Sequence, residues 1–177
     1  MRYHGRRMTF RLRTFALAVC SLFMTSFSSA ETLGLGADAP IVSGTTETGA
    51  TLNLGDVYKK QPYTLVYFYP MADTPGCTKQ GCSLRDAYED LTKKGVAIIG
   101  VSTDTVEAQK AFKDKYRLPF TLIADTDSKV VRAFGQPGVK FAKREAYLVK
   151  NGKIVYADHQ GSTTKQAEDI LAYIAKN

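Results

Sequence analysis

The stretch Tyr63-Thr64-Leu65-Val66-Tyr67-Phe68-Tyr69-Pro70, followed closely by Thr74-Pro75-Gly76-Cys77, decides the fold of this chain. Its first seven residues form a continuous β-branched and aromatic run, which is typical of a central strand buried on both faces. Pro70 ends that strand. Thr74 suits a helix N-cap and Pro75 suits the first helical position, so Cys77 falls at the third. The sequence predicts a strand, a short loop and a helix that begins with a thiol.

The position of Cys77 indicates redox chemistry. A helix N-terminus carries roughly half a positive charge and free N–H groups, and it therefore stabilises a thiolate. A second thiol, Cys82, follows five residues later. Helical spacing places Cys77 on the core-facing stripe with Leu84, whereas Cys82 shares an outer face with Asp86 and Glu89. An activated cysteine with a possible partner thiol predicts a redox site.

Apolar runs and amphipathic segments alternate along the rest of the chain. We expect a small hairpin within an extension from Glu31 to Gln61, strands at 96–101, 120–124, 146–149 and 154–157, and helices from Thr74 to Lys94 and at 106–116, 128–134 and 164–175. Asn151-Gly152 between the last two strands is a strong hairpin signal. This order predicts an α/β thioredoxin-like fold, with a central mixed sheet flanked by helices.

The N-terminus has the anatomy of a secretory signal. Arginines precede an apolar stretch from Phe15 to Phe27 and the small-x-small sequence Ser28-Ser29-Ala30. About 13 apolar residues are short for a membrane span. We expect residues 1–30 to be cleaved, leaving 31–177 as a single domain that is exported, into the periplasm if the source is bacterial. An uncleaved anchor and acylation at Cys20 are the alternatives.

The charge distribution argues against a nucleic-acid partner. The chain has 24 basic and 17 acidic residues, but five of the basic ones are arginines within the first 30 residues. The remainder is nearly neutral, so no basic surface is indicated. After residue 30 only two cysteines and His159 are left as soft metal ligands, which do not make a zinc site. We expect no cofactor, no metal and no stable membrane association.

The motif resembles that of a known family. Pro70-x-x-x-Thr74-x-x-Cys77 is similar to the peroxiredoxin active-site motif, and Val66 to Thr78 with Cys82 and Leu84-Arg85-Asp86 resembles the peroxiredoxin Q group, also called bacterioferritin comigratory protein. The segments 100–104 and 120–125 are similar to this group as well. The resemblance covers nearly all of residues 31–177 and implies the peroxiredoxin variant of the thioredoxin-like fold.

The resemblance also implies roles for individual residues. Cys77 is expected to be the peroxidatic cysteine and Cys82 the resolving one, forming a Cys77–Cys82 disulfide when oxidised. Thr74 would hold the thiolate and the peroxide through its hydroxyl, Pro70 would shield the sulfur, and Arg144 would complete the site. The implied substrates are hydrogen peroxide or organic hydroperoxides, with a thioredoxin-like protein as reductant. We expect a monomer or a weak dimer.

The residues themselves leave other interpretations open. A thioredoxin-like disulfide oxidoreductase shares the fold, although it normally needs C-x-x-C rather than the C-x4-C found here. A redox-sensing module would use the same two thiols as a switch. Thr74 would serve as a plain helix cap in any protein, and Arg144 beside Lys143 would be an ordinary solvated charge.

Overall fold

The structure is a computed structural model that describes residues 1–2, 33–138 and 140–177. Apart from Met1 and Arg2, the expected signal peptide lies outside these residues, and so does Cys20. Within the described ranges, none of the helices combines the length and the hydropathy that crossing a membrane requires.

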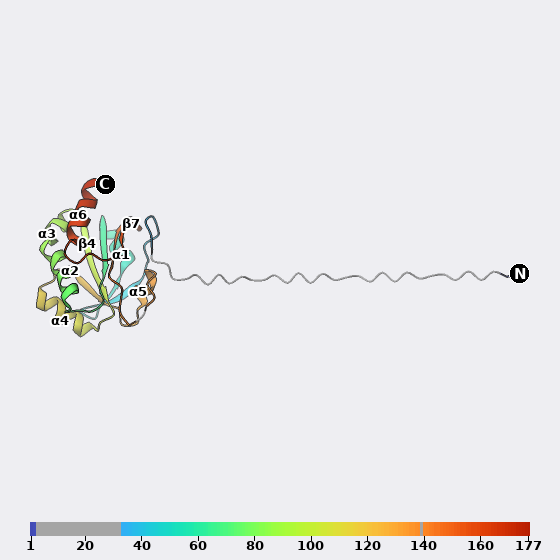
Figure 1. The fold of residues 1–177 in the computed structure, drawn as a ribbon, viewed down its shortest axis with the longest axis horizontal. Helices are drawn as coiled ribbons and strands as arrows, with labels where there is room; N and C mark the ends of the chain where they lie inside the picture. Colours follow the sequence, from blue (N-terminus) through green and yellow to red (C-terminus); the bar gives the residue numbers. More distant parts are fainter. Residues whose placement is uncertain (3–32, 139) are drawn as a thin grey trace.

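A single mixed sheet of seven strands, in the order β2-β1-β5-β4-β3-β6-β7, forms the centre of the fold (Figure 1). Its three central strands are parallel: β3 (Tyr63–Phe68), β4 (Val96–Ser102) and β5 (Thr121–Ala124). The outer strands run antiparallel to their inner neighbours: β1 (Ser43–Thr46), β2 (Thr51–Asn53), β6 (Glu145–Lys150) and β7 (Lys153–Asp158). The predicted α/β fold with a mixed sheet is confirmed.

Helices cover both faces of the sheet (Figure 1). One face carries α2 (Pro75–Asp86), α3 (Tyr88–Lys93), α4 (Val106–Tyr116) and α6 (Gln166–Lys176), and the other carries α1 (Leu54–Lys60) and α5 (Lys129–Ala133). All six residues of β3 are buried, with Leu65 and Tyr67 in the first core and Val66 and Phe68 in the second. Burial on both faces explains the continuous apolar run of this strand.

Two local expectations are wrong. The helix expected from Thr74 to Lys94 is divided at Ala87, whose φ of −97° and ψ of 10° interrupt the helical hydrogen bonds between α2 and α3. At the end of α2, Arg85 donates from Nη1 to the carbonyl of Tyr116, 2.8 Å away. Helix α1 was not predicted, because its seven residues, with Gly55 at the second position, carry too short an apolar pattern.

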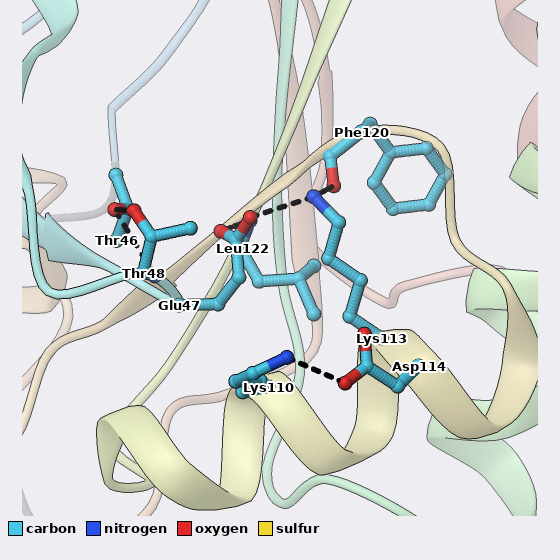
Figure 2. A network of polar contacts seen from close by, with 8 residues as sticks. All are labelled: Thr46, Glu47, Thr48, Lys110, Lys113, Asp114, Phe120 and Leu122. Atoms are coloured by element: carbon cyan, nitrogen blue, oxygen red, sulfur yellow. Dashed lines mark hydrogen bonds and ion pairs between the residues drawn. The ribbon is translucent and has the colours of Figure 1, made fainter.

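A buried ion pair fastens the N-terminal hairpin to the rest of the fold (Figure 2). Glu47, in the β1–β2 turn, accepts from Lys113 Nζ at 2.6 Å and from the backbone N–H of Leu122 at 2.9 Å. Lys113 also donates to the carbonyl of Phe120 at 2.8 Å. The carboxylate therefore joins the hairpin to both β5 and α4.

The outer edge of β7 is partly covered by the segment that precedes β1. The N–H of Gly36 donates to the carbonyl of Ile154, the N–H of Ile154 donates to that of Ala37, and the N–H of Ala39 donates to that of Gly152. These bonds occupy backbone groups that an exposed sheet edge would offer to another chain.

Candidate active site

Cys77 lies at the start of α2, where the chain leaves the carboxyl end of the central strand β3. Its side chain is 1% exposed and belongs to the core under α2. Thr74 has the extended conformation of an N-cap, with φ −91° and ψ 153°, and Pro75 begins the helix. The first intrahelical bond runs from the N–H of Thr78 to the carbonyl of Thr74, at 2.8 Å. Cys77 therefore occupies the first turn, as predicted, where backbone N–H groups lack intrahelical partners.

Arg144 contacts the Cys77 sulfur. Strand β6 pairs antiparallel with β3 and places Glu145 opposite Phe68, so the residue before β6 arrives beside the carboxyl end of β3. From there Nη2 of Arg144 donates to Sγ of Cys77 at 3.3 Å. The side chain that sequence alone could not distinguish from a solvated charge is brought to the thiol.

Gln80 holds the other arm of the guanidinium. This side chain is fully buried, one turn after Cys77, and its Oε1 accepts from Nη1 of Arg144. Its Nε2 donates to Oε1 of Gln166, at the start of α6, at 2.7 Å. The arginine fork thus spans a thiol and an amide on successive turns of α2, which fixes its plane.

Two glycines leave room for Arg144. A Cβ at Gly76 would lie 3.1 Å from Nη2 of Arg144. Gly161, with a φ of +61°, packs so closely that a Cβ there would overlap the arginine side chain and its carbonyl. The loop that carries Gly161 is held by Asp158, whose carboxylate accepts from the backbone N–H groups of residues 160–162. The arginine is therefore held between α2 and the loop after β7.

The loop from Pro70 to Thr74 forms another wall and is anchored at two adjacent residues, Ala72 and Asp73. The N–H of Ala72 donates to Asp104 Oδ2 at 2.7 Å. Asp73 has a left-handed φ of 57°, and its carboxylate accepts from Lys115 Nζ at 2.6 Å and from the Tyr116 hydroxyl at 2.5 Å. These two donors hold the pKa of the Asp73 carboxyl below its ordinary value, the hydrogen bond from Lys115 having the larger effect.

The Thr74 side chain does not cap the helix. Its hydroxyl donates to the carbonyl of Met71 at 2.9 Å, and it makes no capping bond to α2. Thr74 holds the N-cap position by its backbone alone, so the expected side-chain cap is wrong. The hydroxyl oxygen keeps its lone pairs for another donor.

Cys82 lies in a different environment from Cys77. It is half-buried in a groove of about 910 Å³ between α2, α3 and α6, together with acidic side chains such as Asp86, Asp90 and Glu168. Both cysteines are free thiols and both belong to the twelve-residue helix α2. We expected Cys77 to face the core and Cys82 to lie on the outer side of the helix. In the structure Cys77 is buried in the core and Cys82 lines the groove.

Tyr67 in β3 and Tyr69, directly after that strand, belong to the same core as the Cys77 thiol. Tyr67 and Tyr69 stack at 5.5 Å, and the hydroxyl of Tyr69 donates to Gln109. Burial raises the pKa of both hydroxyls, so they remain protonated. No cluster of three or more side chains suited to a metal ion occurs among the described residues.

Sequence reasoning missed Gln80, Asp73 and Gly161. Gln80 lies three residues after Cys77, on the same helical stripe, which is a signal available from the spacing alone. Asp73 and Gly161 act through left-handed backbone conformations in loops, and local sequence gives little indication of such geometry. Pro70 stands where it was expected, at the end of β3, and is half-buried.

Comparisons with known proteins show the family to which the chain belongs. The model of the AhpC/TSA family matches residues 35–157. The chain is 46% identical over 101 residues to the peroxiredoxin bcp of Coxiella burnetii and 43% identical over 120 residues to the chloroplastic peroxiredoxin Q of Sedum lineare, covering 57 and 64% of this chain. The aligned parts span 66 and 63% of those relatives' own lengths.

Solved structures show the same fold over a larger share of the chain. Peroxidoxin BcpB of Mycobacterium tuberculosis has a TM-score of 0.75 at 26% identity, covering 81% of this chain and 97% of that one. Peroxiredoxin Q of Xanthomonas campestris has a TM-score of 0.71 at 27% identity, covering 84 and 98%. With a family model that matches most of its length, the chain belongs to the AhpC/TSA family.

Proposed function

We propose that the protein is a thiol-dependent peroxidase that reduces hydrogen peroxide and organic hydroperoxides for antioxidant defence. The observation that carries the proposal is the 3.3 Å contact between Arg144 Nη2 and Cys77 Sγ at the start of α2. In this contact a cation lies beside a sulfur in the first turn of α2, where backbone N–H groups lack intrahelical partners. Such an arrangement suits displacement at a peroxide oxygen, where negative charge develops on the departing oxygen.

In the first step the Cys77 thiolate attacks one oxygen of the peroxide. The O–O bond breaks, the sulfur becomes a sulfenic acid, and the other oxygen departs with the bonding electrons and takes a proton to give water or an alcohol. Arg144 and the Cys77 N–H are the donors for that oxygen. The Thr74 hydroxyl, three residues before Cys77 in the sequence, belongs to the loop that forms a wall of the site. Positioning of the peroxide by these groups supplies the part of the rate acceleration that thiolate formation alone does not supply.

In the second step Cys82 attacks the sulfenic sulfur, a disulfide forms, and water leaves. Five residues in one helix separate the two Cα atoms by about 8.5 Å and about 140° around the axis. A disulfide needs Cα atoms within about 7 Å and converging side chains. Because both thiols belong to α2 in the described reduced state, the first turns of the helix must unwind before the bond forms.

The disulfide is then reduced by a protein dithiol, for which a thioredoxin-like protein is the expected class. We also propose that residues 1–30 act as a cleaved signal, that residues 31–177 form the functional domain, and that it works in an exported compartment, the periplasm if the source is bacterial. The arginines, the apolar stretch from Phe15 to Phe27 and Ser28-Ser29-Ala30 support export. Cell fractionation and N-terminal sequencing of the exported protein would test it.

The decisive experiment compares the full chain with Cys77→Ser and Cys82→Ser in rapid-quench peroxide reactions, with thiols mapped by mass spectrometry. Cys77→Ser should abolish peroxide reduction. Cys82→Ser should keep the first turnover and accumulate the sulfenic acid. Equal loss of the first turnover in both variants would contradict the assigned roles.

Two assays separate this proposal from the alternatives. Peroxide consumption with dithiothreitol is expected of a peroxidase and not of a disulfide oxidoreductase or of a redox-sensing module. Insulin reduction is expected of the disulfide oxidoreductase. Insulin reduction without peroxide consumption would therefore replace the proposed function.

A further inference from the structure

We propose that Gln166 and the Ser83–Thr164 contact form a latch between α6 and α2 that sets how readily α2 unwinds, and hence how the sulfenic acid is partitioned between disulfide formation and further oxidation. This inference rests on the proposed function, since it concerns the second step of the same cycle. Its residues are positioning residues that touch neither the sulfurs nor the peroxide.

The latch consists of two hydrogen bonds one helical turn apart. Gln80 Nε2 donates to Gln166 Oε1 at 2.7 Å, and Ser83 Oγ donates to the carbonyl of Thr164 at 3.0 Å. Gln80 lies between the two cysteines and Ser83 directly follows Cys82, whereas Gln166 is the first residue of α6 and Thr164 lies two residues before that helix. The turns of α2 that must unwind are thus the turns that α6 holds.

The inner bond of the latch is buried. Gln80 is fully buried and Gln166 is 2% exposed, so water does not compete for this contact. Gln80 also accepts from Arg144 through its amide oxygen. The hydrogen bonds therefore run in one direction, with Arg144 donating to Gln80 and Gln80 donating to Gln166. Unwinding α2 withdraws Gln80 from both partners at once, so that release of the arginine and release of α6 are one event.

The latch also contains a built-in weakness. Because Gln80 Nε2 donates to Gln166, the Gln166 amide must present its oxygen, and its own Nε2 is buried without a hydrogen-bond partner among the described residues. An unmade hydrogen bond of this kind disfavours the folded arrangement. When α2 unwinds, that N–H₂ group is free to be solvated. The closed state is therefore held firmly enough to form the site and weakly enough to open.

Two outcomes compete once the sulfenic acid has formed. Attack by the Cys82 thiol forms the S–S bond and releases water, and it requires the open latch. Attack on a second peroxide molecule transfers an oxygen to the same sulfur, giving a sulfinic acid and water or an alcohol, and it uses the closed site. Weakening the latch should favour the disulfide.

The test uses Gln166→Met in the full chain, which removes the acceptor at similar side-chain volume. The variant loses the unpaired Gln166 Nε2 but leaves Gln80 Nε2 without its acceptor, so the net change is the lost hydrogen bond. Because the chain has no tryptophan, the sulfenic, disulfide and sulfinic forms are followed by acid quench and mass spectrometry. With a dithiol reductant present, the peroxide concentration that converts half of the protein to the sulfinic form should rise about fivefold, the factor that corresponds to one net neutral hydrogen bond. An unchanged concentration would overturn the latch.

Two further variants separate the latch from general effects. Ile170→Val shortens a fully buried α6 side chain and loosens its packing without touching a hydrogen bond to α2, so it should leave the partition unchanged. Ser83→Ala raises the helix propensity of α2 but removes the outer bond. The latch predicts less sulfinic product for Ser83→Ala, whereas helix propensity alone predicts more.

The outcomes are distinguishable. An equal shift in Ile170→Val and Gln166→Met, or more sulfinic product in Ser83→Ala, would contradict the latch. Failure of the wild-type protein to consume peroxide would instead contradict the proposed function. If Gln166→Met does not fold, Ser83→Ala decides the matter, because its contact lies at the surface.

Discussion

Arg144 donates to the sulfur of Cys77 across 3.3 Å although the two residues are 67 positions apart in the sequence. The antiparallel register of β6 on β3 makes this contact possible, and Gln80 holds the second arm of the guanidinium. A lysine at this position would keep the charge but could not reach both partners as a planar fork.

Arg144→Lys should therefore slow the first attack on peroxide by about 100-fold, the loss typical of removing one donor to a developing oxyanion. The rate of sulfenic acid formation, measured by rapid quench, is the relevant quantity. The neighbouring exposed Lys143 offers a matched control, and Lys143→Ala should react at the wild-type rate. Similar rates for Arg144→Lys and the wild type would show that the arginine has no role in the first attack on peroxide.

Two glycines of α2 should affect different steps. A Cβ at Gly81 meets Leu118 and Phe112 at ordinary contact distances of 3.5 and 3.6 Å, so Gly81→Ala should be accommodated and should strengthen the helix. A gain of about 1 kcal/mol in helix propensity corresponds to disulfide formation slowed about fivefold, with more sulfinic product.

Gly76→Ala should act on the first step instead. Its Cβ would lie 3.1 Å from Arg144 Nη2, so the guanidinium must shift away from the thiol. Sulfenic acid formation should slow in Gly76→Ala and stay nearly unchanged in Gly81→Ala. The two rates are read from one quench series, and the reverse pattern would contradict the structure.

The anchor of the loop before α2 should depend on pH. Hydrogen bonds from Lys115 and Tyr116 keep the pKa of Asp73 below its ordinary 3.8, so the contribution of Asp73 to stability is complete above that value and is lost as the pH falls through the lower, folded pKa. Nuclear magnetic resonance titration should give a midpoint below 3.8, and Lys115→Met should raise it. Asp73→Asn keeps the left-handed conformation accessible, and its stability should differ from the wild type above pH 3.8 but not at strongly acidic pH. An ordinary midpoint in the wild type would show that the anchor is absent in solution.

The ion pairs Glu47–Lys113 and Lys110–Asp114, both drawn in Figure 2, predict how three substitutions rank in their effect on stability. Lys113→Met leaves the carboxylate of Glu47, 7% exposed, without its cation, and should lower the free energy of unfolding by about 3 kcal/mol. Glu47→Gln keeps an acceptor for Leu122 and leaves a quarter-exposed ammonium that water can reach, so about 1 kcal/mol is expected. Lys110→Met, which breaks the exposed pair with Asp114, should change little. Urea unfolding would measure all three, and an equal loss in Lys110→Met and Lys113→Met would contradict the role of burial.

The fold could be predicted from sequence largely because β3 is buried on both faces. A strand whose residues are apolar on both faces can be recognised from its sequence. The Asn151-Gly152 turn likewise predicts the β6–β7 hairpin. The break at Ala87 could not be predicted, because the apolar spacing continues through it while the backbone does not. Its position is set by contacts such as that of Arg85 with Tyr116, which belong to the folded chain.

The candidate site divides in the same way. Cys77 is fixed by local signals, the strand end and the helix start. Arg144 could be placed only through a family resemblance, since the register that brings it to the thiol is a property of the sheet. Gln166 gave no signal, because its role depends on Gln80 presenting one amide atom to each neighbour. For Thr74 the predicted N-cap position is correct, but the predicted hydrogen bond is wrong, because its hydroxyl donates to the carbonyl of Met71 and not to the helix.

The segment that covers the edge of β7 also determines which way the molecule faces when it is tethered. Residues 36–39 pair with the chain around Gly152 and Ile154, at the end of the sheet where β3 begins, whereas Cys77 follows the end where β3 finishes. The chain therefore enters the fold, at residues 36–39, on the side away from the thiol. An affinity tag, a solid support or a carrier protein attached there would leave the opposite end of the sheet, where α2 begins, unobstructed, so immobilised protein should remain open to both peroxide and reductant.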